Sequence, residues 1–157
     1  MSWIASVNAS CQRLRDERLT LDAKGCTEGE IVALEAKTGG PFPAAYRHFL
    51  GEVGRDWGRF MVGSDVALGD LLRINGEARE LVAEAGTTLP PSAFVFLMHQ
   101  GHVFLCFFSG QGDDPPVHRF MEGEGLKALG ISFSEWLWLA ADDEIRIWKR
   151  LNAEAGS

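Results

Sequence analysis

The sequence predicts an α+β fold in which a central, mostly antiparallel β-sheet is flanked by several helices. Two observations predict this class. Apolar residues recur at three- and four-residue steps through most of the N-terminal half and again near the C-terminus, which is typical of amphipathic helices. Between them, residues 93–108 are dense in Val, Phe and Leu, which is typical of strands. With 157 residues, of which 46% are hydrophobic, the chain has the size of one domain, so we expect 1–157 to fold as a single unit.

Three helices are expected in the first third of the chain. The first covers Trp3–Leu14, where apolar residues form one stripe. The second begins at Thr27, which forms a Thr-x-x-Glu capping box with Glu30, and it ends at Thr38-Gly39-Gly40. The third begins near Pro43, because a first helical turn does not need the N–H that proline lacks.

The middle of the chain combines one further helix with several strands. Residues 59–63 are a candidate strand after a glycine-rich turn. Asn75 is expected to cap a fourth helix that ends at Gly86. Ala93–Met98 and Val103–Phe108 are predicted to form a β-hairpin, and because both faces of each strand are apolar, we expect the hairpin to be central or covered by helices.

The C-terminal third is expected to hold one more strand and a last helical region. The Pro115-Pro116 dipeptide restricts Val117–Phe120 to an outer strand, since proline cannot donate to a sheet ladder. Ser132 is positioned to cap the last helix, with Glu135 completing a capping box. Asp142-Asp143 is expected to interrupt this region, which leaves one broken helix or two consecutive helices as alternatives.

Composition excludes several classes of function. The net charge of −7, from 22 acidic and 15 basic residues, argues against a nucleic-acid partner, since such binding depends on Lys and Arg neutralising phosphates. Cys11, Cys26 and Cys106 are odd in number and form no CxxC pair, so we expect reduced thiols. The longest apolar run is too short to span a membrane and no signal-peptide pattern opens the chain, so we expect a cytoplasmic protein without a membrane partner.

His99 and His102 are the strongest candidates for metal chemistry. Across a tight hairpin their imidazoles would stand opposite each other and could share a metal ion. A working site needs a third ligand, and no sequence spacing brings Asp113, Asp114 or His118 to the pair. Two packed or solvated histidines are therefore the preferred interpretation, with no metal and no cofactor, and a small metal-dependent hydrolase is the alternative.

The Asp113-Asp114 pair is the other candidate for catalysis. Two aspartates between Gly112 and Pro115 suit a turn, because Asp bonds its own backbone, and a turn is preferred to acid–base chemistry. Neither Ser109 nor Cys106 has a nucleophile motif such as G-x-S-x-G around it. The sequence therefore predicts a binding protein without catalytic residues.

The order of several motifs resembles the SUKH superfamily, which contains yeast cell-wall-assembly regulators and bacterial immunity proteins of polymorphic toxin systems. The motifs that carry the resemblance are Thr27-x-x-Glu30-Ile31, Phe42-Pro43-x-x-Tyr46-x-x-Phe49-Leu50, Asp114-Pro115-Pro116-Val117 and Ser132-Phe133-Ser134-Glu135-Trp136-Leu137. The resemblance covers residues 27–140 and leaves 1–26 as an additional N-terminal helix. Arg55-Asp56 departs from the Asn-Gly turn that members often carry. The resemblance implies a protein-binding module that in bacteria neutralises a cognate toxin.

Contact residues are expected among acidic and aromatic side chains in turns. The candidates are Asp56, Trp57, Asp113, Asp114, Glu122 and Glu124. Acidic turns would dock on a basic toxin, such as a nuclease, and raise the association rate. Trp57 would be an exposed anchor, or would instead fold back onto the protein, and Trp138 is a weaker candidate. A regulatory scaffold that recruits other proteins is the rival function, and the oligomeric state stays open.

Overall fold

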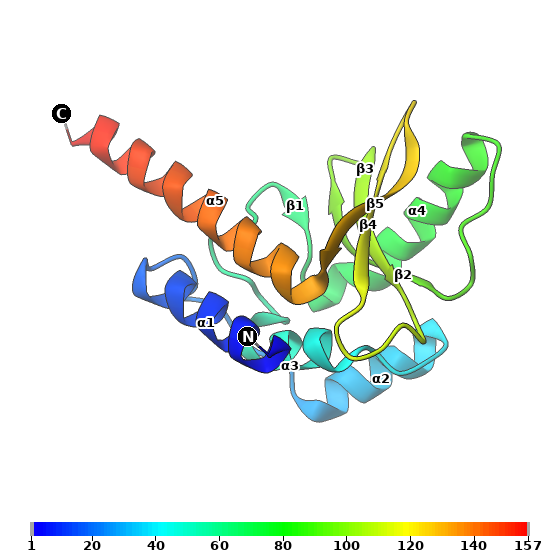
Figure 1. Cartoon of the computed structure of the whole chain (residues 1–157), viewed down its shortest axis with the longest axis horizontal. Helices are drawn as coiled ribbons and strands as arrows, with labels where there is room; N and C mark the ends of the chain where they lie inside the picture. Colours follow the sequence, from blue (N-terminus) through cyan, green and yellow to red (C-terminus); the bar gives the residue numbers. More distant parts are fainter. Residues whose placement is uncertain (1, 157) are drawn as a thin grey trace.

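The computed structural model describes residues 2–156, so Met1 and Ser157 of the expected domain lie outside the described residues. It confirms the α+β class: helices surround an antiparallel sheet in the order β1-β2-β3-β4-β5 (Figure 1). The helices are α1 (Trp3–Asp16), α2 (Glu28–Thr38), α3 (Ala44–Val53), η1 (Leu68–Asp70), α4 (Leu71–Glu84) and α5 (Phe133–Ala155). The strands are β1 (Ser64–Asp65), β2 (Ala93–His99), β3 (Val103–Phe108), β4 (Pro116–Met121) and β5 (Gly125–Ser132).

An aromatic cluster joins α3, α5 and the two central strands. The ring of Tyr46 on α3 lies 5.6 Å from that of Phe94, 5.2 Å from Phe107 and 5.5 Å from Phe133, measured between ring centroids. All four side chains are buried. Edge-to-face and tilted ring pairs of this kind add to the stabilisation from apolar burial. The N-terminal turns of α3 and α5 are thereby held against the same part of the sheet.

The predicted helix boundaries in the N-terminal half are confirmed where they depend on local chemistry. The Thr27 hydroxyl accepts a hydrogen bond from the Glu30 N–H at 3.2 Å, and the Glu30 carboxylate accepts one from the Thr27 N–H at 2.9 Å. Gly39 ends α2 with φ of +91°, a conformation that glycine adopts without strain. Pro43 stands at the N-cap of α3, one residue before the position expected.

The strand predicted at residues 59–63 is wrong. This segment is a turn, and β1 begins immediately after it at Ser64. Gly58, Met61 and Gly63 all have positive φ, at +67°, +60° and +94°. Three left-handed residues within six positions cannot form an extended strand, although the apolar composition of the segment suggests one.

The predicted cap at Asn75 is also wrong, because the helix begins earlier, at Leu71. The Asn75 amide nitrogen donates to the carbonyls of Leu71 (2.8 Å) and Val95 (2.9 Å). Its amide oxygen accepts from the N–H of Val95 at 2.8 Å. One side chain therefore satisfies both main-chain groups of a β2 residue and ties α4 to that strand.

The expected outer strand at 117–120 is an interior strand. β4 does begin at its Pro116, but it lies between β3 and β5. The sequence pattern missed β5 because this strand has no regular apolar alternation: Lys127 and Ala128 are exposed, and Gly125 and Gly130 have positive φ. In the strand order, β5 is one of the two edge strands, and β1 is the other.

The expected interruption at Asp142-Asp143 does not occur, and α5 runs unbroken for 23 residues. Asp142 accepts hydrogen bonds from Arg13 on α1 at 3.0 Å and from Arg146 one turn later at 2.6 Å. These arginines lower the pKa of Asp142, Arg146 through the larger effect, and stabilise its carboxylate. A charge that has partners at this spacing supports a helix.

The three thiols are buried and unpaired with one another, as expected for reduced cysteines. Burial raises the pKa of Cys11 to about 12, that of Cys26 to about 11 and that of Cys106 to about 12. These thiols stay protonated near neutral pH and are therefore poor nucleophiles. None of the helices within residues 2–156 combines the length and the apolar character needed to cross a membrane.

Candidate protein-binding surface

Trp57 is not the exposed anchor that its turn sequence suggests. Its side chain is 2% exposed and packs edge-to-face on Phe49 at 4.8 Å and parallel to Phe60 at 5.5 Å. The turn after α3 folds back onto the helix and brings the indole into the core. The interpretation of Trp57 as an exposed contact is therefore wrong, whereas its neighbour Asp56 is exposed.

The Asp114 carboxylate is hydrogen-bonded to the first turn of α5. Its two carboxylate oxygens accept hydrogen bonds from the N–H of Ser134 at 2.8 Å and from the Ser134 hydroxyl at 2.6 Å. The first N–H groups of a helix have no partner within the helix, and a carboxylate there also interacts favourably with the helix dipole. Of the Asp113-Asp114 pair, only Asp113 is exposed, and Asp114 is partly buried.

The four exposed carboxylates that were predicted as contacts, Asp56, Asp113, Glu122 and Glu124, lie at three corners of the molecule. The carbonyl of Asp113 accepts from the N–H of Ala45, at the first turn of α3, whereas Asp56 follows the other end of that helix, roughly 15 Å away by helical rise. Glu122 and Glu124 follow the end of β4, and the length of this strand, about 20 Å, separates them from Asp113. The structure does not gather these carboxylates into one patch.

The two histidines of the metal hypothesis do not face each other. In the sheet register His99 lies opposite Val103, and its Nδ1 is 3.0 Å from the Ser64 hydroxyl. His102 lies in the turn, where its Nδ1 is 2.9 Å from the carbonyl oxygen of Gln100. The expected opposition of the two imidazoles is wrong, and no group of three or more His, Cys, Asp or Glu side chains suited to a metal was found among residues 2–156.

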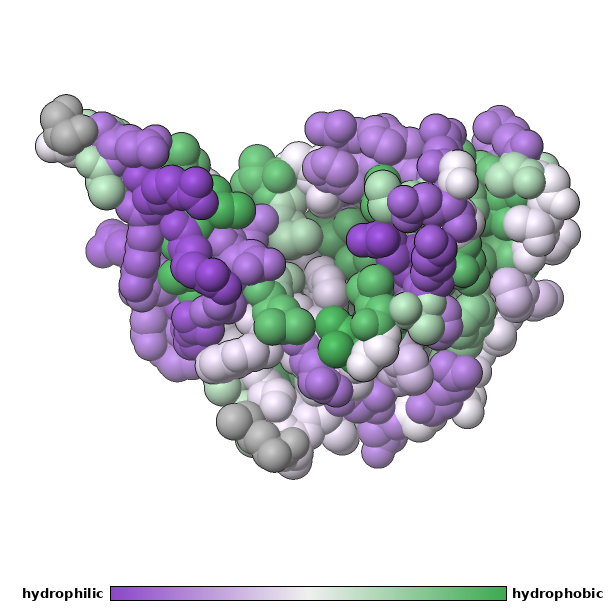
Figure 2. All heavy atoms as spheres, turned by 45° about the horizontal axis from the view of Figure 1, so that its top comes forward, coloured by the Kyte–Doolittle hydropathy of each residue, from purple (hydrophilic) through white to green (hydrophobic). Residues whose placement is uncertain are grey.

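Trp138, the weaker candidate, is 38% exposed on α5. The Arg13 guanidinium lies 4.7 Å above its ring, so one face of the indole is covered by a cation–π contact. Leu139 beside it is 51% exposed. Figure 2 shows hydrophobic residues across the middle of the visible face and mostly hydrophilic residues on the projecting end of α5.

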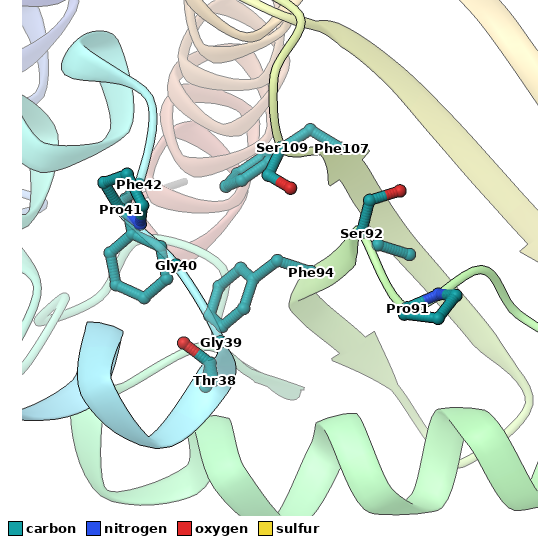
Figure 3. A pocket seen from close by; sticks show the side chains of 11 residues that line it. Thr38, Gly39, Gly40, Pro41, Phe42, Pro91, Ser92, Phe94, Phe107 and Ser109 are labelled. Atoms are coloured by element: carbon teal, nitrogen blue, oxygen red, sulfur yellow. The ribbon is translucent and has the colours of Figure 1, made fainter.

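A preformed pocket of about 200 Å³ lies between the last turn of α2 and the start of β2 (Figure 3). Its floor is aromatic: Phe94 lies 4.6 Å from Phe42 and 5.6 Å from Phe107. Thr38, Gly39, Gly40, Pro41, Pro91, Ser92, Ala93 and Ser109 complete its lining. No lining residue is charged, and the volume is below the roughly 300–1,000 Å³ of small-molecule sites. The pocket suits one uncharged side chain of a partner protein.

The walls of this aromatic pocket are fixed by hydrogen bonds. Arg79 on α4 donates to the carbonyls of Leu89 at 3.0 Å and Ala93 at 3.1 Å, which holds the segment before β2. On the other side, the 109–115 loop is attached to α3 through the carbonyl of Asp113 and to α5 through Asp114. A partner would meet a surface that is already ordered, which lowers the entropy cost of binding.

A second hollow, which we call the α2–α4 groove, has a volume of about 290 Å³. It is lined by Ala33, Leu34, Leu68, Gly69 and Leu72, with Glu30 and Lys37 also on its walls. Lys37 of this groove and Thr38 of the aromatic pocket are consecutive, so both hollows border the last turn of α2. Sequence reasoning missed the groove because it placed the start of α4 at Asn75, beyond the leucines that line it.

Comparison with protein-family models matches residues 25–138 to the SMI1 / KNR4 family (SUKH-1). The chain belongs to this family. The match confirms the SUKH resemblance and supports a general role in protein binding and immunity. Both hollows and all four exposed carboxylates lie inside the SUKH-1 region, whereas α1 and most of α5 lie outside it. A search of curated proteins gave no match.

Proposed function

We propose that this SUKH-1 chain acts as a single-domain immunity protein that binds and neutralises a cognate bacterial toxin. The observation that carries the proposal is the aromatic pocket beside the fixed 109–115 loop, in a family whose general role is protein binding. The pocket offers an apolar anchor site and Asp113 offers a charge at the same corner. Interfaces obtain most of their binding energy from a few such anchors.

The net charge of −7 favours a partner whose surface is positively charged. A toxin with a basic surface, such as a nuclease, would be attracted before contact, because complementary charge raises the rate of encounter. Asp56, Asp113, Glu122 and Glu124 are the proposed contact carboxylates, each facing solvent at its corner. Neutralisation then requires only that the bound chain covers the toxin's substrate site, and no group of this chain has to react.

The three protonated, buried thiols suit a reducing compartment. A cytoplasmic location is therefore part of the proposal: the chain would meet its toxin inside the cell that needs protection.

The experiment is co-expression with the toxin encoded by the neighbouring gene. We expect the chain to restore growth of cells that express the toxin domain and to co-purify with it in a stable complex. A regulatory scaffold would instead co-purify with several host proteins and leave toxicity unchanged. Continued toxicity in cells that contain the folded chain would contradict the immunity function.

A further inference from the structure

The α2–α4 groove is mainly apolar and open to solvent, and Glu30 and Lys37 are its charged lining residues. Leu72 on its α4 side is 45% exposed. Leu68 in η1 and Leu72 in the first turn of α4 supply one wall. Leu68 and Leu72 on one wall, with Ala33 and Leu34 on the other, form the kind of groove that accepts the apolar face of a helix.

One side of α4, the helix whose first turn borders this groove, is strongly acidic. Asp70, Glu77 and Glu84 recur every seven residues, which places them on one side of the helix about 10 Å apart. Arg73 pairs with Asp70 at 3.2 Å and with Glu77 at 2.9 Å, whereas no basic group lies within 4.0 Å of the Glu84 carboxylate among residues 2–156. We call Asp65, Asp70, Glu77, Glu80 and Glu84 the acidic stripe.

The acidic stripe keeps a net negative charge. Among residues 2–156, Arg73 is the basic residue that forms ion pairs with the stripe, to Asp65 at 3.3 Å as well as to Asp70 and Glu77. Arg79 does not offset it, because its guanidinium donates to the carbonyls of Leu89 and Ala93 at the other side of the helix. A cation on a partner therefore gains attraction here, and an anion is repelled.

We infer that the α2–α4 groove binds a basic amphipathic helix of the partner protein. Apolar side chains of that helix fill the space between Leu34, Leu68 and Leu72, and Lys or Arg residues at seven-residue spacing face the acidic stripe. The inference rests on the proposed immunity function and identifies the partner element that the SUKH-1 fold recognises. The adjoining aromatic pocket would take a side chain from the segment beyond the end of the helix.

The test begins with the full chain and the purified toxin domain from the neighbouring gene. If the wild-type protein forms no complex with this toxin domain, the result contradicts the proposed immunity function itself and not the assignment of the groove. With a complex in hand, Leu72→Glu should raise the dissociation constant at least tenfold, because it places a carboxylate in the apolar groove. Leu151→Glu is the matched control: this leucine is 49% exposed on α5, away from the groove, and should change the constant less than twofold.

A second variant, on the opposite wall of the groove, ensures that the test does not depend on a single substitution. Ala33→Glu should weaken the complex as Leu72→Glu does, and circular dichroism of each variant checks that it is folded. The Glu77→Lys/Glu84→Lys double variant should slow association and reduce its salt dependence. The inference is overturned if folded Leu72→Glu and Ala33→Glu both bind within twofold of wild type, or if wild type is a dimer that Leu72→Glu converts to a monomer, since a second copy would then occupy the groove.

Discussion

Adjacent residues of the same type have different roles in this chain. Asp113 and Asp114 are both loop aspartates, yet one is exposed and the other holds the first turn of α5. The sequence correctly places this pair in a loop, but it cannot separate the two roles, because the partner of Asp114 is Ser134, twenty residues later.

Replacement of Asp114 by alanine should lower the free energy of unfolding by about 1–2 kcal/mol, the usual loss when a helix N-terminus loses a side-chain cap. Asp113→Ala is the control and should change it by less than about 0.5 kcal/mol, because its exposed carboxylate makes no hydrogen bond within the described chain. Urea unfolding monitored by circular dichroism measures both. Equal losses would show that the Asp114 bonds to Ser134 do not stabilise α5.

Glu35 provides a pH-dependent test. Its carboxylate accepts from Arg47 at 3.0 Å and from the Phe42 N–H at 2.6 Å, and these bonds, Arg47 first, lower its pKa. A pKa lower in the folded than in the unfolded state stabilises the fold above the unfolded pKa, and the stabilisation is lost as pH falls through the folded value. Glu35→Gln should therefore cost about 1.5–3 kcal/mol at pH 7 and little in strong acid.

The matched control for Glu35 is Glu28→Gln, because Glu28 pairs with the same arginine but its side chain is 69% exposed. It should have a much smaller effect at pH 7, since solvent screens exposed ion pairs. The free energies of unfolding of both variants are measured from pH 7 into the acid range. If the decrease caused by Glu35→Gln does not become smaller in acid, the charge of the Glu35 carboxylate does not stabilise the fold.

Among the helices, α1 and most of α5 lie outside the region that matches the family. They pack together and are joined by Arg13–Asp142 at 3.0 Å and Glu17–Lys149 at 3.1 Å. The C-terminal turns of α5 project from the body (Figure 1). Although the family match begins at residue 25, α1 contributes the fully buried Val7 and Leu14 to the core. We therefore regard α1 as part of the folded unit.

Leu14→Ala tests this role of α1. Removal of a fully buried leucine side chain should lower the free energy of unfolding by about 2–5 kcal/mol, measured by urea unfolding. Leu151→Ala, at an exposed position of α5, should cost less than about 0.5 kcal/mol. A loss below about 1 kcal/mol for Leu14→Ala would mean that α1 is only loosely attached to the core.

Elements were predictable where their signals are local. The capping boxes at Thr27 and Ser132 and the hairpin from Ala93 to Phe108 are each encoded by residues close in sequence, and all are confirmed. β5 was not predictable, because its place depends on pairing with β4 and not on its own pattern. At Asp142, where α5 continues, one of the two arginine partners, Arg13, is also distant in sequence.

At the scale of the whole molecule, the sequence supported the α+β class, the family and a binding role, but not the location of the surface. Of the six predicted contact residues, Trp57 is buried, Asp114 is hydrogen-bonded to the first turn of α5, and the other four are spread over three corners. The two hollows beside α2 could not be foreseen, because Leu72 and Phe94 are brought to them by the packing of α4 and β2.

The most direct test of the immunity function is a titration of toxin activity. The purified toxin domain encoded beside this chain is mixed with increasing amounts of the folded protein, and its enzymatic activity is measured. Binding that covers the toxin's substrate site predicts a linear fall in activity that ends at about one equivalent, with Leu72→Glu requiring a large excess. Full toxin activity in the presence of excess folded wild-type chain would contradict the proposed function.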